Sequence, residues 1–133
     1  MSHIFPVRVY YEDTDCAGVV YHANYLKFME RARTEALRTQ GYELSNLLHK
    51  HDTQFVVHSA QLEFLQPARL DQLLYIVTKV TEVRFASIKY TQVVHLEAAD
   101  GQIACKADLR IACLNGSYCP RGLPDILSKG IRQ

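Results

Sequence analysis

Several features that define large classes of protein are missing from this chain of 133 residues. No apolar run approaches the roughly 20 residues that a membrane-spanning helix needs. Residues 1–6 also lack the basic start and apolar core of a secretory signal. We therefore expect no membrane span, and we expect a cytoplasmic location.

An excess of charge and a pattern of metal ligands are missing as well. The formal net charge is +1 and the pI is about 7.7, which gives no strong field to attract nucleic acid or an anionic membrane. The four cysteines show no C-x-x-C spacing and form no cluster with histidine. The sequence predicts free thiols in a reducing compartment, with no metal site, no cofactor and no nucleic-acid partner.

No linker, repeat or low-complexity stretch divides the chain, which predicts one domain over residues 1–133. The clearest helix covers residues 24–40, with Asn24 as its N-cap and Gly41 as its C-terminal stop. Its apolar residues recur three and four positions apart and are Tyr25, Phe28, Met29, Ala32, Ala36 and Leu37. Glu30 and Arg33 lie three positions apart outside this stripe, and we expect them to form an ion pair.

The remaining pattern indicates strands. Residues 4–11 form a short candidate strand, and 12–22 form a loop. β-branched and aromatic residues then dominate 54–65, 72–83, 85–97 and 102–114, and in the last stretch Cys105, Ala107, Leu109, Ile111 and Cys113 share one face. Short helices are expected at 45–49, capped by Ser45, and at 124–129. This order predicts an α+β fold in which an antiparallel sheet wraps around one long central helix.

The loop before the long helix is the segment with chemical potential. It carries three carboxylates, Glu12, Asp13 and Asp15, and one glycine, Gly18. N–H groups at a helix start lack intrahelical acceptors and lie at the positive end of the helix dipole, so they can hold a developing oxyanion. Spacing alone leaves two readings open: carboxylates that form turns and caps, or a catalytic carboxylate beside an oxyanion site.

Residues 13–25, DTDCAGVVYHANY, resemble the signature of the 4-hydroxybenzoyl-CoA thioesterase family, and within it the Tol–Pal-associated acyl-CoA thioesterases. The stretch ERARTE at 30–35 and the strand and turn residues within 55–71 fit the same subgroup. The resemblance implies the hotdog fold and an acyl-CoA substrate, with aliphatic acyl groups favoured. It identifies Asp15 as the catalytic carboxylate, whereas Cys16 departs from the usual Gly, Pro or Ala without an expected consequence.

The resemblance also implies a backbone N–H near His22, with Tyr21 beside it, that holds the thioester oxygen. Asp15 then either attacks the thioester carbonyl or activates a water molecule, and the His22 side chain is a competing base because histidine titrates near neutrality. We expect Gly18, Val19 and Tyr25 to bind substrate. Arg84 and Lys89, near a predicted turn between strands, are candidate contacts for the CoA phosphates.

Two other functions remain open at this point. One is a hotdog dehydratase or hydratase, which would use a histidine with an acidic partner for proton transfer. The other is a binding protein for acyl carrier protein or a cell-envelope complex, with little turnover. The resemblance further implies a homodimer in which two sheets join, and a homotetramer built as a dimer of dimers, with sites at the subunit interface.

Overall fold

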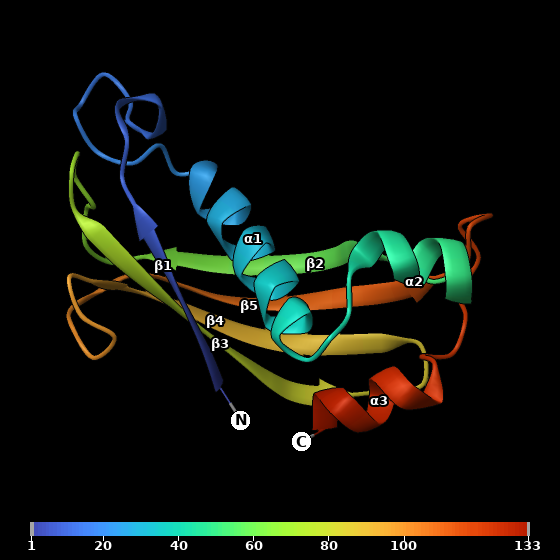
Figure 1. Ribbon diagram of the computed structural model, residues 1–133. Helices are drawn as coiled ribbons and strands as arrows, with labels where there is room; N and C mark the ends of the chain where they lie inside the picture. Colours follow the sequence, from blue (N-terminus) through green and yellow to red (C-terminus); the bar gives the residue numbers. More distant parts are fainter. Residues whose placement is uncertain (1, 133) are drawn as a thin grey trace.

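A computed structural model describes residues 2–132 of the chain, in which five strands form one antiparallel sheet. The strands are β1 (Ser2–Arg8), β2 (Gln54–Phe64), β3 (Leu73–Val83), β4 (Ser87–Leu96) and β5 (Ile103–Leu114). They lie in the order β1-β3-β4-β5-β2, so β1 and β2 form the two edges. The long helix α1 (Asn24–Thr39) crosses one face of the sheet, with α2 (Leu44–His51) and α3 (Asp125–Arg132) at its far end (Figure 1).

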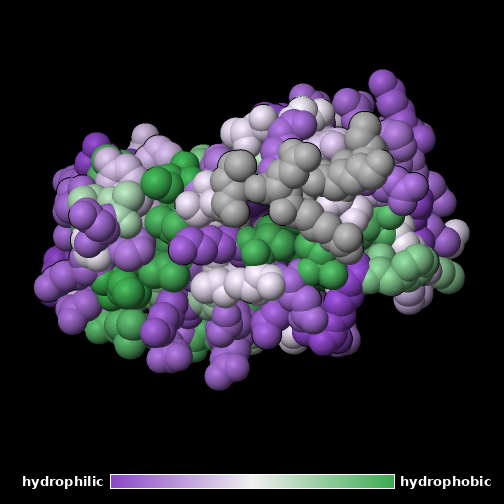
Figure 2. Space-filling model, turned by 90° about the horizontal axis from the view of Figure 1, so that it is seen from below, coloured by the Kyte–Doolittle hydropathy of each residue, from purple (hydrophilic) through white to green (hydrophobic). Residues whose placement is uncertain are grey.

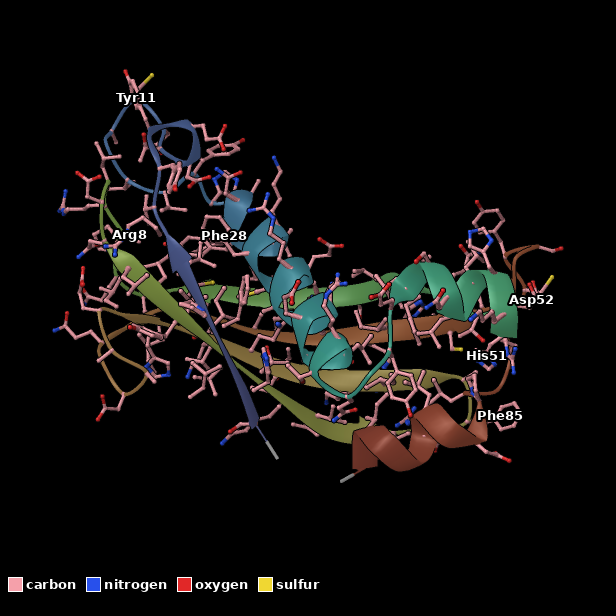
Figure 3. The ribbon with its side chains drawn as sticks, in the orientation of Figure 1. Arg8, Tyr11, Phe28, His51, Asp52 and Phe85 are labelled. Carbon is pink, nitrogen blue, oxygen red and sulfur yellow. The ribbon has the colours of Figure 1, made fainter. Side chains whose placement is uncertain are left out.

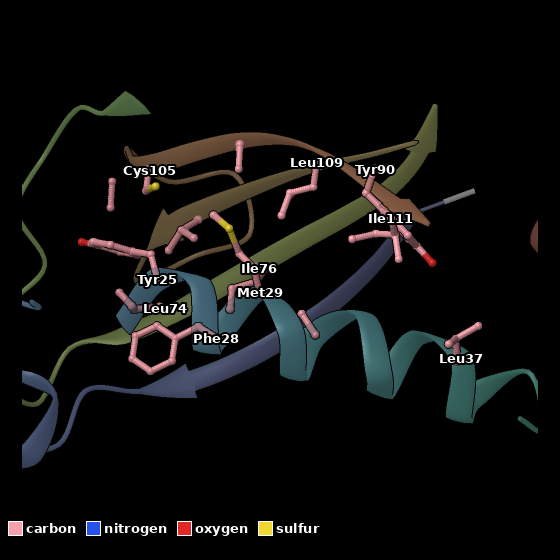
Figure 4. Close-up of a cluster of buried hydrophobic side chains, with 14 of the residues drawn as sticks. Tyr25, Phe28, Met29, Leu37, Leu74, Ile76, Tyr90, Cys105, Leu109 and Ile111 are labelled. Atoms are coloured by element: carbon pink, nitrogen blue, oxygen red, sulfur yellow. The ribbon is translucent and has the colours of Figure 1, made fainter. Parts of the chain in front are cut away.

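The predicted apolar stripe of the long helix is confirmed as its buried face. Tyr25, Phe28, Met29, Ala32 and Leu37 are buried, and Ala36 is partly buried. These side chains meet Leu74 and Ile76 of β3 and Leu109 and Ile111 of β5 (Figure 4). Each large aliphatic or aromatic side chain buried in this way contributes roughly 1.5–3 kcal/mol, so the contact between helix and sheet is the main source of stability.

The alternation predicted for the last strand is confirmed too. Cys105, Ala107, Leu109, Ile111 and Cys113 are buried beneath the helix layer, whereas Lys106 and Asp108 are exposed on the opposite face. A period of two places successive side chains on opposite faces of a sheet. On the face seen from below in Figure 2, hydrophobic and hydrophilic side chains are mixed.

Several local predictions need correction. The first strand ends at Arg8 rather than residue 11, because Tyr11–Asp13 turn into a short 3-10 helix, η1. Asn24 is the first residue of α1 rather than its N-cap, which is Ala23. Ser45 lies inside α2, whose N-cap is Glu43 and has no side-chain capping bond. The terminal helix is also longer than predicted, at Asp125–Arg132.

The predicted Glu30–Arg33 ion pair is wrong. Arg33 points into the core, where it is 9% exposed, and its Nη1 donates to Oε1 of Gln92 at 3.0 Å. The guanidinium forms no ion pair with any carboxylate within 4.0 Å among residues 2–132. Over the same stretch of chain, no helix is long and apolar enough to cross a membrane.

Candidate active site

The loop between β1 and α1 is a tight turn built around Gly18. Thr14 and Val20 form an isolated antiparallel bridge, and the Asp15 N–H donates to the Val19 carbonyl at 2.9 Å. Between them the Gly18 N–H donates to the Asp15 carbonyl at 3.0 Å. Gly18 has a φ of +79°, a left-handed conformation that glycine adopts without the strain a side chain would cause. Glycine at this position therefore allows the turn that presents Asp15.

The Asp15 side chain is held by one oxygen and open at the other. Its Oδ1 accepts a hydrogen bond from the Ala17 N–H at 2.8 Å, an interaction within the turn itself. Oδ2 has no hydrogen-bond partner among residues 2–132, and the side chain is exposed in the single chain. One oxygen thus fixes the orientation of the carboxylate, and the other is free to reach a substrate or a water molecule.

The start of α1 supplies free backbone donors next to this loop. The Tyr21 N–H is occupied, because it donates to the Asp13 carbonyl at 2.9 Å. The N–H groups of His22 and Ala23 have no acceptor within the described part of the chain. The side-chain amide Nδ2 of Asn24 donates to the same Asp13 carbonyl at 2.9 Å, which ties the helix to the loop. The free donors expected near Tyr21 and His22 are therefore those of His22 and Ala23.

A second segment, far away in sequence, forms the other wall of the site. The Val20 N–H donates to the Ala68 carbonyl at 2.8 Å, and Val19 bridges to Arg69. The two segments line an open cavity of about 300 Å³. Its lining comprises Asp15, Val19, Val20, His22, Tyr25, Phe64, Leu65, Gln66 and Pro67. The predicted residues Asp15, Val19, His22 and Tyr25 thus meet in one place.

Aromatic rings close the inner side of this cavity. Tyr25 is buried, with its ring centroid 5.8 Å from that of Phe64 and 6.3 Å from that of Phe28. The His22 ring lies between Tyr21, at 4.6 Å, and Phe64, at 6.1 Å. Burial raises the pKa of Tyr25 to about 12, with a smaller opposing effect of a hydrogen bond to the Ala68 backbone. Tyr25 therefore stays neutral at physiological pH and forms part of an apolar wall.

Arg84 and Lys89 do not join this cavity within one chain. Arg84 follows β3 and adjoins Phe85, which Figure 3 shows at the opposite end of the sheet from Tyr11 in the site loop. Its Nε donates to Glu82 Oε1 at 2.9 Å, and this hydrogen bond lowers the pKa of Glu82. Lys89 lies opposite Glu82 on β4. A contact between either residue and CoA stays a prediction.

The sequence did not single out the segment after β2. Phe64, Leu65, Gln66 and Pro67 all line the cavity, but on its own each reads as an ordinary strand end. The available signal was the LEF…PARLD stretch within the family resemblance. Among residues 2–132, no three His, Cys, Asp or Glu side chains are grouped to hold a metal ion.

Known proteins show what this arrangement resembles. The sequence pattern of the Thioesterase superfamily matches residues 17–101. An acyl-CoA thioesterase, YbgC, from Haemophilus influenzae is 44% identical over 121 residues, which cover 90% of this chain and 87% of that protein. The crystal structure of a probable thioesterase from Bartonella henselae is 36% identical and superposes with a TM-score of 0.87 over 93% of this chain and 100% of the other.

A more distant structure agrees in fold. A mutant 4-hydroxybenzoyl CoA thioesterase in complex with 4-hydroxybenzoyl CoA is 19% identical and superposes with a TM-score of 0.90 over 98% of each chain. At that identity the likeness shows the fold alone, and it confirms the predicted hotdog arrangement of sheet and central helix. With the family pattern and the YbgC relative, these matches show that the chain belongs to the thioesterase superfamily, with the hotdog fold.

Proposed function

We propose that this protein hydrolyses acyl-CoA thioesters to a free acid and CoA, with Asp15 as the catalytic carboxylate. The observation that carries the proposal is that Asp15, with one free carboxylate oxygen, and His22 line the same cavity, at a helix start where the N–H groups of His22 and Ala23 have no acceptor. Acyl transfer needs both a group that delivers the nucleophile and donors for the oxyanion. The YbgC relative is itself named an acyl-CoA thioesterase, which favours hydrolysis over hydration or dehydration.

The two N–H groups have the role of stabilising charge. As the thioester carbonyl carbon is attacked, its oxygen becomes negative, and donors at a helix start strengthen their hydrogen bonds to it. Thiolate then leaves without the help of a strong acid. The substrate's acyl group lies against Val19 and Tyr25, and the turn at Gly18 lets the backbone approach the thioester. The imidazole of His22 packs between two aromatic rings and is the competing candidate for the base.

The open oxygen of Asp15 fits either route of hydrolysis. As nucleophile, it attacks the carbonyl carbon, expels CoA thiolate and forms a mixed anhydride that water hydrolyses. As general base, it takes a proton from the water that attacks. A single turnover in ¹⁸O-water with enzyme in excess, combined with hydroxylamine trapping of an acyl-enzyme, distinguishes the two. An acid that carries no ¹⁸O has taken its second oxygen from Asp15, whereas an acid that carries one ¹⁸O, with no anhydride trapped, fits the general base.

The central test is Asp15→Asn beside Glu12→Gln, which makes the same change of charge in the same loop. Turnover of a panel of short, long and aromatic acyl-CoAs is followed by thiol release. We expect Asp15→Asn to lower kcat by roughly 10²–10⁴-fold, and we expect Glu12→Gln to stay near wild type. Normal turnover by a folded Asp15→Asn protein would refute the assignment, and turnover lost only in His22→Ala would move the role of base to His22.

We infer that the working unit is a homodimer formed through β2. Strand β2 is the longer edge of the sheet, with 11 residues against seven in β1, and β1 contains Pro6, which cannot donate to a neighbouring strand. The β2 edge also carries exposed apolar side chains, with Val57 52% and Phe64 53% exposed. An unpaired apolar edge favours pairing with another strand. Because Phe64 lines the catalytic cavity, a partner at this edge would complete the site.

Light scattering tests this dimer with a matched pair of variants. Val57→Lys places a charge on the β2 edge, and Ile4→Lys does the same on β1, where Ile4 is also exposed. We expect Val57→Lys alone to reduce the mass and the turnover together. A monomeric wild-type protein with full activity would refute the dimer. A tetramer made of two such dimers, in which Arg84 or Lys89 reaches the CoA of a neighbouring subunit, is the larger assembly we propose.

The carrier and location complete the proposal. The four cysteines are all free, as expected in the reducing cytoplasm. Acyl carrier protein is acidic, and the exposed Arg69, beside the catalytic loop, gives it a basic contact. Comparison of kcat/KM for one acyl group on CoA and on acyl carrier protein identifies the preferred carrier. Co-purification with Tol–Pal envelope proteins tests the association implied by the subgroup resemblance.

A further inference from the structure

The core beneath α1 contains a charged group that the proposed reaction does not use. Arg33 is 9% exposed, and one of its nitrogens donates to Gln92. Gln92 is fully buried and donates in turn to the Met29 carbonyl and the Thr78 hydroxyl, both at 2.9 Å. The guanidinium therefore has one neutral acceptor and, within residues 2–132, no carboxylate within 4.0 Å.

A buried charge without a counter-charge is costly. A guanidinium carries five N–H donors and stays protonated inside proteins, and burial away from water penalises its charged form. Burial is the main cause that lowers the pKa of Arg33, and the charges of Tyr90 and of the exposed Glu30 oppose it more weakly. Gln92 satisfies one donor and brings no negative charge. The other N–H groups of the Arg33 guanidinium therefore favour an anion beside them.

Those donors border a cavity between α1 and β2. It has a volume of about 130 Å³ and is lined by Arg33, Thr34 and Tyr90 on its polar side. Its other walls are apolar and include Leu37, Leu44, Phe55, Val57 and Ile111. Glu30 also borders the cavity but is exposed. A space with one buried cation and mostly apolar walls fits an anion attached to a hydrocarbon chain, rather than a free inorganic ion.

Tyr90 adds a second donor, since it lines this cavity and also a neighbouring one between α1 and β3. It is 5% exposed, and its hydroxyl has no hydrogen-bond partner in the described chain. Burial raises the pKa of Tyr90 to about 12. The phenol is therefore neutral and able to donate a hydrogen bond at physiological pH. Among residues 2–132 the only buried side-chain N or O atom without a hydrogen-bond partner is Nδ1 of His3, so the Tyr90 hydroxyl is open to the cavity. A neutral phenol beside a guanidinium that has one neutral acceptor favours a ligand with oxygen atoms.

We propose that the cavity between α1 and β2 binds the carboxylate of an aliphatic chain, with Arg33 and Tyr90 as its donors. A carboxylate presents two oxygens that match the guanidinium fork, and its chain lies against the apolar walls. Ala23 and Arg33 are ten positions apart in the sequence. At about 1.5 Å per residue along a helix, the cavity lies roughly 15 Å from the oxyanion donors.

Two sources supply this chemistry. One is a free fatty acid, which is also the product of hydrolysis. The other is the distal carboxylate of an acyl group that carries a carboxyl at its far end, held with its thioester at Asp15. The second source rests on the proposed function, whereas the first does not. Binding and turnover are therefore measured separately.

The binding experiment uses calorimetry with octanoate and, as an uncharged match, octanol. We expect octanoate to bind wild type, and Arg33→Met to weaken it by roughly tenfold to a hundredfold, as for loss of a charged hydrogen bond. Tyr90→Phe should weaken it less, and Arg38→Met, on the exposed side of the same helix, should leave it unchanged. Equal binding of octanol, or unchanged binding in both Arg33→Met and Tyr90→Phe, would overturn the proposal.

The turnover experiment compares dodecanoyl-CoA with the CoA thioester of its ω-carboxy derivative, whose extended chain spans the roughly 15 Å between the oxyanion donors and the cavity. If the distal carboxylate occupies the cavity, Arg33→Met lowers kcat/KM for the carboxylated substrate alone. If Arg33→Met weakens the binding of octanoate but leaves kcat/KM for both thioesters unchanged, the ligand is a free fatty acid. Dodecanoyl-CoA turnover that is lost in Asp15→Asn but kept in Arg33→Met shows that the catalytic proposal stands by itself. If wild type binds no carboxylate and Arg33→Met converts a dimer into a monomer, the counter-charge of Arg33 comes from a second copy of the chain. That result would refute the proposed ligand site.

Discussion

The buried network around Gln92 allows a sharp test of how this core is stabilised. Gln92→Met keeps the length and apolar volume of the side chain but removes hydrogen bonds to three partners, Arg33, Met29 and Thr78. Loss of the bond to the charged guanidinium costs about 1.5–3 kcal/mol, and each neutral bond costs about 1 kcal/mol. The expected loss in the free energy of unfolding is therefore about 4 kcal/mol, a large part of the roughly 5–15 kcal/mol typical of a folded domain.

Urea unfolding followed by far-UV circular dichroism measures this loss, because the chain has no tryptophan to report by fluorescence. With a slope of about 2 kcal/mol per molar urea, the midpoint should fall by roughly 2 M at a fixed protein concentration. Gln102→Met, at an exposed glutamine, is the control and should change the free energy by less than about 0.5 kcal/mol.

A double-mutant cycle then isolates the contact with Arg33. Because Arg33→Met removes the charge that Gln92 solvates, Gln92→Met should cost less in that background by about 1.5–3 kcal/mol. Arg33→Met alone should be close to neutral or stabilising, since apolar replacement of a buried charge removes its desolvation cost. A loss below about 1 kcal/mol for Gln92→Met in the wild-type background would refute the reasoning.

Two further predictions concern pH and the catalytic turn. Burial raises the pKa of Cys105, Tyr25 and Tyr90 to about 12, so the unfolded chain loses these protons at lower pH than the folded chain. The free energy of unfolding should therefore fall as pH rises from about 9 to 12. In urea titrations Cys105→Ala should make this fall less steep, and an unchanged dependence on pH would contradict the prediction. Gly18→Ala and Gly41→Ala both place a side chain at positive φ, +79° and +91°, with open space around it, so each should lose roughly 1 kcal/mol. Only Gly18→Ala should also lower thioesterase turnover, and equal turnover in both variants would separate the turn from catalysis.

Local patterns carried the secondary structure and the identity of the site. The spacing of Tyr25, Phe28 and Met29 depends only on the helical period, and the alternation from Cys105 to Cys113 depends only on the strand period. Both were predicted without knowledge of neighbouring elements, and both are confirmed. The motif around Asp15 needed the family resemblance, because its carboxylates alone are equally suited to turns and caps.

The tertiary structure decided what no local pattern contains. Arg33 lies outside the apolar stripe, yet it is buried because Gln92, 59 residues later, offers its side chain an acceptor. Phe64 and Pro67 reach the site because Val20 bonds to Ala68 across the loop. Arg84, a basic residue plausible for any phosphate, adjoins Phe85, which lies at the other end of the sheet from Tyr11 of the site loop because β3 carries the chain there (Figure 3). By itself, the sequence determined the periods of helix and strand, since neighbouring residues impose them, and it carried the family signature. Which side chains share a cavity followed only from the pairing of distant segments, because burial and contact depend on residues that are remote in sequence.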